Sequence, residues 1–112
     1  MKTIELTGAA LDWAVAKCEG VDYLSAHNAG DASEFFSYST NWAHGGPLIE
    51  REIIATGRGG AYEHNFWRAC AGYSSVSSHG PTPLIAAMRC FVASKLGDNI
   101  EIPEELTKGE SK

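Results

Sequence analysis

The stretch from Gly80 to Pro103 constrains the fold more than any other part of this sequence, because it carries signals for both ends of a helix. Thr82 is placed to accept a hydrogen bond from a free N–H of the first helical turn. Pro83 then falls at the first helical position, where its missing N–H does no harm, and Gly97 predicts the helix end. Apolar residues between these ends recur at helical spacing on one broad face: Leu84, Ile85, Met88, Phe91, Val92 and Leu96.

Two short strands are predicted near the ends of the chain. Ile100 and Ile102 alternate with polar residues until Pro103 ends the pattern. Residues 3–6 alternate in the same way and predict a strand at the N-terminus.

A second long helix is predicted near the N-terminus, with Thr7 as its N-cap and Gly20 as its stop. After it, residues 21–24 predict a brief strand, residues 25–33 a polar surface loop, and residues 34–38 an aromatic strand. The buried stripe of the helix consists of Leu11, Ala14, Val15 and Cys18.

The middle of the chain contains a glycine-rich turn followed by a proline. Gly45 and Gly46 free the backbone to turn, and Pro47 predicts the opening of a short helix. Such an opening leaves backbone N–H groups that can face an anion. The alternative interpretation is a tight turn with Trp42 packed beneath it.

The remaining segments complete an α+β fold. Residues 53–56 and 65–71 read as two strands joined by a glycine-rich connection, which predicts an antiparallel hairpin, and residues 72–80 read as a loop. We expect a small antiparallel sheet packed against two main helices plus one short helix. Residues 1–106 are expected to form a single domain, and residues 107–112 a disordered tail.

Composition excludes several classes of function. The net charge of −5 argues against binding to extended nucleic acid, which requires a basic face. No apolar run approaches the roughly 20 residues that span a bilayer. No signal peptide is recognisable, so we expect the three cysteines to be reduced thiols of a cytosolic protein. They are Cys18, Cys70 and Cys90.

No catalytic or metal-binding pattern is found. The four histidines are isolated in sequence, and none is paired with a cysteine or a second histidine at ligand spacing. There is no nucleophile elbow and no nearby Cys–His pair. The sequence therefore predicts neither an enzyme nor a cofactor.

Arginines and helix starts together predict a pocket for an anion or a nucleotide. Guanidinium groups match the geometry of phosphate, helix N-termini supply backbone donors, and aromatic rings offer flat surfaces. The alternative is that the arginines pair with the 14 acidic residues and that the aromatics belong to the core. The predicted ligand-binding residues are Asn41, Trp42, Gly45, Gly46, Arg51, Arg68, Thr82 and Arg89.

Three strings of this sequence carry a family resemblance. Residues 41–52, residues 80–97 and the opening residues 1–17 resemble the NinX-like family of small proteins from tailed bacteriophages and prophages of enteric bacteria. The resemblance covers nearly the whole chain, and residues 55–79 match least. It implies a phage accessory protein in the bacterial cytoplasm, and it carries no established activity from which a catalytic residue could be transferred.

Three hypotheses for the function follow. The first is a non-catalytic binder of a small anionic ligand such as a nucleotide, which would sequester a host defence signalling nucleotide in the host cytoplasm. The second is a protein–protein module that inhibits or redirects a host or phage protein. The third is a small enzyme acting on a nucleotide. The oligomeric state stays open, because one small-residue face serves either a homo-oligomer or the core: Ala86, Ala87 and Ala93.

Overall fold

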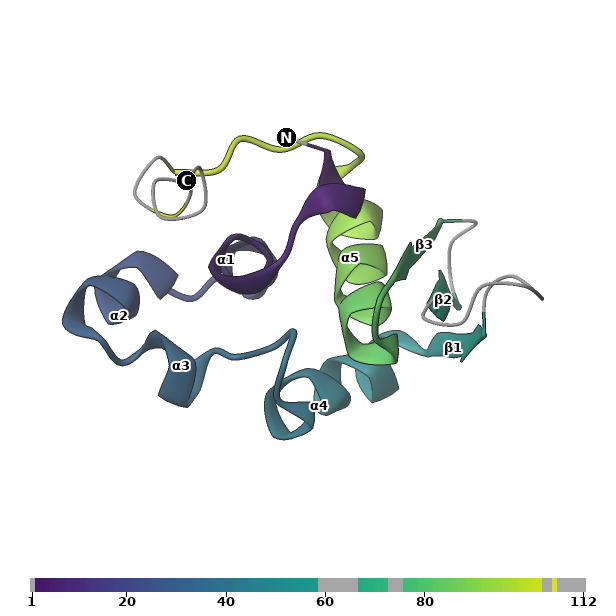
Figure 1. Ribbon diagram of the computed structural model, residues 1–112, viewed down its shortest axis with the longest axis horizontal. Helices are drawn as coiled ribbons and strands as arrows, with labels where there is room; N and C mark the ends of the chain where they lie inside the picture. Colours follow the sequence, from purple (N-terminus) through teal and green to yellow (C-terminus); the bar gives the residue numbers. More distant parts are fainter. Residues whose placement is uncertain (1, 59–66, 73–75, 104–105, 107–112) are drawn as a thin grey trace.

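A computed structural model describes residues 2–58, 67–72, 76–103 and 106 of the chain (Figure 1). The predicted tail, residues 107–112, lies outside this described part. In chain order the elements are the 3-10 turn η1 (Thr3–Glu5), the helices α1 (Gly8–Glu19), α2 (Tyr23–Ala29), α3 (Ala32–Phe35) and α4 (Trp42–Glu52), the strands β1 (Ile54–Arg58), β2 (Trp67–Ala71) and β3 (Ser77–Gly80), and the helix α5 (Pro83–Leu96).

Helix α5 has the capping bonds that the sequence predicts. The hydroxyl of Thr82 accepts a hydrogen bond from the N–H of Ile85 at 3.0 Å, and Pro83 is the first helical residue. At the other end Gly97 adopts a φ of 91°, and its N–H donates to the carbonyl of Ala93 at 2.9 Å. A side-chain cap of this kind stabilises a helix by about 1 kcal/mol. The prediction of this helix is confirmed from end to end.

Helix α5 lies between the sheet on one side and α1 on the other (Figure 1). Because both faces are covered, most of its side chains are buried, unlike those of a surface helix with one apolar stripe. The small-residue face belongs to this core, since Ala86 and Ala87 are 0% exposed and Ala93 is 9% exposed. That face therefore packs inside the chain.

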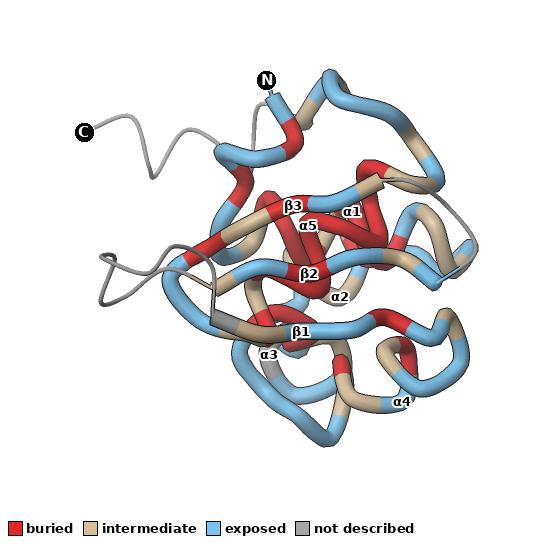
Figure 2. Tube along the Cα trace, turned by 90° about the vertical axis from the view of Figure 1, so that its right-hand side faces the viewer, coloured by how far each residue is buried: buried red, intermediate tan, exposed pale blue. Residues whose placement is uncertain are grey.

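The sheet has three antiparallel strands in the order β1-β2-β3, which confirms the α+β class and the predicted hairpin (Figure 2). Residues 72–80 were expected to form a loop, and this is wrong, because residues 77–80 form the edge strand β3. The serine-rich segment has no apolar alternation, so its pairing with β2 decides its structure. Gly80 permits the close approach of α5, because a Cβ there would lie 2.9 Å from Ile85 Cγ2.

The segment between α1 and α4 also differs from the prediction. Residues 21–38 were expected to form a strand, a loop and a second strand, but they contain the helices α2 and α3. Asp22 caps α2 by accepting a hydrogen bond from the N–H of Ser25 at 3.2 Å, and Gly30 ends it with a φ of 85°. Helices of seven and four residues are too short to be stable alone, so tertiary packing decides them.

Neither terminal strand is present. Residues 3–5 form the turn η1, and residues 100–102 form no strand. The two ends of the described chain meet in a single β-bridge between Lys2 and Asn99, supported by the Thr3 N–H, which donates to the Asp98 carbonyl at 2.7 Å. One pair of residues is too short a contact for a ladder. Of the alternating apolar residues, Leu6 is buried in the core and Ile100 and Ile102 pack against it, whereas Ile4 is exposed.

Helix α4 begins five residues before the predicted start at Pro47. Asn41 is the N-cap, and its side-chain oxygen accepts from the N–H of Ala43 at 2.9 Å. Pro47 lies inside the helix, where proline normally costs about 3 kcal/mol or more. Gly45 lets the helix pack closely, because a Cβ there would collide with the Tyr38 carbonyl. The expected anion-facing helix start at Pro47 therefore does not exist.

Candidate ligand-binding site

The two family strings meet in space where α4 and α5 begin. Trp42 and Thr82 line the same hollow of about 210 Å³, together with Thr40. Gly45 packs against α5, since a Cβ there would lie 2.7 Å from Leu84 Cδ1. The side-chain oxygen of Asn41 accepts the capping bond at the start of α4, and Gly46 lies inside this helix. Five of the predicted ligand-binding residues thus lie close to this junction: Asn41, Trp42, Gly45, Gly46 and Thr82.

The three predicted arginines lie in three different places. Arg51 forms a bidentate ion pair with Glu19, with Nη1–Oε1 and Nη2–Oε2 distances of 3.0 and 2.6 Å, and its Nε donates to Glu52 at 2.9 Å. Arg89 is 7% exposed and donates to two backbone carbonyls. Arg68 lies exposed on β2 beside a hollow of about 270 Å³. The structure therefore does not assemble these side chains into one pocket, and their roles in binding stay predictions.

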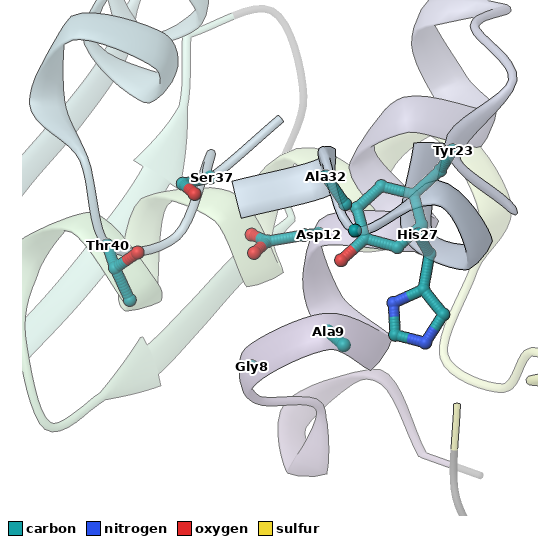
Figure 3. A pocket seen from close by; sticks show the side chains of 9 residues that line it. Gly8, Ala9, Asp12, Tyr23, His27, Ala32, Ser37 and Thr40 are labelled. Atoms are coloured by element: carbon teal, nitrogen blue, oxygen red, sulfur yellow. The ribbon is translucent and has the colours of Figure 1, made fainter. Parts of the chain in front are cut away.

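A larger cavity lies between α1, α2 and the turn that leads into α4. Its volume is about 420 Å³, and we call it the Asp12 cavity. Figure 3 shows the Asp12 carboxyl between Ser37 and Thr40 on one side and Tyr23 and His27 on the other. The lining residues are Gly8, Ala9, Asp12, Tyr23, His27, Gly30, Ala32, Ser37 and Thr40.

The Asp12 carboxyl is unusual because it is a 7% exposed acid on a helix rich in alanine. Its Oδ1 accepts a hydrogen bond from the backbone N–H of Ser39 at 2.8 Å. Burial raises the pKa of Asp12 from 3.8 to about 6, and the contacts with Ser39 and the field of His44 oppose part of that rise. Asp12 is therefore a buried acceptor held in a fixed orientation.

Aromatic rings and the start of α1 form the other walls. The rings of Tyr23 and His27 stack with centroids 5.9 Å apart and an angle of 20° between their planes. Burial, and secondarily the nearby Asp12, raises the pKa of Tyr23 to about 12, so its phenol stays protonated. Gly8 and Ala9 belong to the first turn of α1, to which the Thr7 side chain makes no capping bond. The first turn of an α-helix generally leaves its backbone N–H groups without partners inside the helix.

The turn over residues 37–40 is fixed at two backbone amides. The N–H of Ser37 donates to Nδ1 of His44 at 2.9 Å, and the N–H of Ser39 donates to Asp12. His44 lies on α4 and Asp12 on α1, so these two bonds join the turn to two different helices. This wall of the cavity is consequently pre-formed, which lowers the entropic cost of binding.

Sequence reasoning did not identify this cavity. Asp12 directly follows Leu11 in a helix that is otherwise mostly apolar around it. An acid at such a position is the sequence signal that could have indicated a buried carboxyl. His27 was treated as an isolated surface residue of a loop that the structure replaces with α2. Within the described residues, no group of three or more metal-ligating side chains is placed to hold an ion. No helix in the described part is long and apolar enough to cross a membrane.

A comparison with family models decides the relationship that the sequence strings suggest. The model described as bacteriophage P22, NinX, matches residues 2–95. The chain belongs to the bacteriophage P22 NinX family. This match makes it a phage accessory protein, and it includes every residue that lines the Asp12 cavity. Among curated proteins, none matches the sequence.

Proposed function

We propose that this NinX-family protein is a non-catalytic binder of a small anionic ligand of the nucleotide class, and that the ligand occupies the Asp12 cavity. One observation carries the proposal. The buried carboxyl of Asp12 and the stacked rings of Tyr23 and His27 line the same cavity of about 420 Å³. Cavities of this size with a few fixed polar groups are typical of small-molecule sites.

Each part of a nucleotide has a counterpart among the lining groups. A base is planar and carries N–H groups, so it can stack on His27 and donate to the Asp12 carboxyl. A phosphate group suits the first turn of α1 at Gly8 and Ala9, because free backbone N–H groups and the helix dipole favour an anion there. A ligand with both parts uses the cavity better than a simple anion does.

The setting of the protein gives this binding a role. A phage accessory protein in the host cytoplasm that holds a nucleotide without converting it would sequester a host defence signal. Asp12 already holds the Ser39 amide, which is a positioning task, so binding without turnover is the simpler interpretation. Recovery of the nucleotide unchanged after long incubation with the protein checks the absence of turnover, and a converted product contradicts it.

Calorimetry tests the binding directly. We expect the wild-type protein to give saturable heat with at least one member of a panel of mononucleotides and cyclic oligonucleotides. His27→Ala removes one stacking surface and is expected to weaken that binding roughly tenfold, since base–aromatic stacking is worth about 1–3 kcal/mol. His79→Ala, which replaces a histidine outside the cavity, is the matched control. Absence of heat for the wild type with every nucleotide would sink the proposal.

A protein–protein role is the second candidate, and exposed aromatic side chains favour it. Phe35 and Trp42 are 55% and 54% exposed. Large aromatics at the surface are typical of interaction sites. Pull-downs from infected cells with the wild type and with Phe35→Ala and Trp42→Ala variants test it. A stoichiometric partner that is lost with either variant supports this function, and native mass spectrometry of the same samples reports any homo-oligomer.

A further inference from the structure

The orientation of the Asp12 carboxyl limits which base can bind beside it. Oδ1 is held by the N–H of Ser39 at 2.8 Å, and Ser39 itself is 2% exposed, so this end of the carboxyl is fixed. The cavity is therefore lined by a carboxyl that cannot turn without breaking a buried hydrogen bond. Its remaining lone pairs are the strongest acceptors that the cavity offers.

We propose that Asp12 selects a guanine-type base, one with two adjacent N–H donors on its pairing edge, over an adenine-type base. This inference rests on the proposed nucleotide-binding function. An ionised carboxylate accepts hydrogen bonds and donates none, so it matches the ring N–H and the 2-amino group of guanine side by side. Adenine presents a bare ring nitrogen on that edge, which would face the carboxylate acceptor to acceptor. A buried polar group left unpaired in this way is strongly selected against.

Neighbouring groups support the same choice. The phenol of Tyr23 and the ring of His27 lie on one side of the carboxyl, and Ser37 and Thr40 lie on the other (Figure 3). None of the lining residues carries a second carboxylate or an arginine or lysine. Asp12 is consequently the one carboxyl group among the lining side chains, and in its ionised form it benefits most a base edge that donates two hydrogen bonds.

Four mononucleotides at about pH 7.5 test the inference by calorimetry: GMP, IMP, AMP and XMP. IMP lacks the 2-amino donor, and we expect it to bind about tenfold more weakly than GMP, the loss of one hydrogen bond to a charged group. AMP is expected to bind at least tenfold more weakly than GMP. Equal or tighter binding of AMP would overturn the inference and leave the proposed nucleotide binding in place.

The variant Asp12→Asn provides a gain-of-function readout. The asparagine oxygen keeps the hydrogen bond from Ser39, so its NH2 group replaces the second carboxylate oxygen. Xanthine carries a carbonyl where guanine carries its amino group, and we therefore expect the variant to prefer XMP over GMP by about tenfold. Asp98→Asn, an exposed acid outside the cavity, should keep the wild-type order.

Each result of these binding experiments supports or overturns the proposed role of Asp12. If Asp12→Asn binds GMP as the wild type does, Asp12 does not read the base and the inference fails. If the variant does not fold, the order of GMP, IMP and AMP on the wild type decides alone. If the wild type binds no nucleotide, the proposed function and the inference fail together.

Discussion

Arg89 is buried without a carboxylate partner among the described residues, and its replacement by methionine should lower the free energy of unfolding. Its Nε donates to the carbonyl of Leu6 and its Nη1 to the carbonyl of His79, both at 2.9 Å. These two bonds tie Leu6, the residue that follows η1, and strand β3 to α5. Hydrogen bonds to charged groups contribute about 1.5–3 kcal/mol each, and each carbonyl left unpaired costs about 1–3 kcal/mol.

The replacement also removes a buried charge, and this offsets part of the lost stability. Burial lowers the pKa of Arg89, because desolvation disfavours the charged form of the guanidinium. Methionine fills a similar volume and removes that cost. The net expectation for Arg89→Met is a loss of about 3 kcal/mol of unfolding free energy, which lowers the Tm by more than about 10 °C in a domain of this size.

Urea unfolding followed by circular dichroism measures this change. Arg51→Met is the matched control, because Arg51 makes more ion pairs but is exposed, and exposed pairs contribute about 1 kcal/mol or less. The reasoning is refuted if Arg89→Met unfolds within about 0.5 kcal/mol of the wild type, or if the Arg51 variant loses as much as the Arg89 variant.

Two further predictions concern α4 and the cavity. Gly45→Ala places a Cβ against the Tyr38 carbonyl and should cost more than about 2 kcal/mol by calorimetry, whereas Gly46→Ala, whose nearest contact is 4.0 Å away, should unfold close to the wild type. The raised pKa of Asp12 means that the folded protein binds more protons than the unfolded chain between about pH 4 and 6. Stability should therefore fall by up to about 3 kcal/mol as the pH rises through that range and level off above it, since this acid favours folding only when protonated. Asp12→Asn should remove this slope in a series of urea unfolding experiments, and an unchanged slope would refute its assignment to Asp12.

Sequence reasoning succeeded where the signals are local. Thr82, Pro83 and Gly97 fix the ends of α5 through bonds to residues within one helical turn, so they can be read without knowing any neighbour. Thr7 and Gly20 likewise bound α1, although the Thr7 side chain makes no capping bond. The β1–β2 hairpin joins strands close in sequence, and its prediction holds for the described residues.

The failures lie where short segments depend on distant partners. Strand β3 is serine-rich and forms because β2 offers a ladder for residues 77–80. Helices α2 and α3 are too short to be stable without packing on the rest of the chain. Pro47 reads as a helix start, yet α4 begins at Trp42, is capped by Asn41 and continues through Pro47, and Gly45 packs this helix against Tyr38 and Leu84.

By itself, the sequence of this NinX-family protein determined its two main helices, a hairpin and the α+β class, because caps, prolines, glycines and apolar periods act over a few residues. Only the tertiary structure decided which polar groups are buried. The pKa of Asp12 is raised because α2 and the 37–40 turn bury its carboxyl, and the charge of Arg51 is paired because α1 brings Glu19 next to it. Burial and charge pairing are properties of the packed chain, and binding chemistry follows from them.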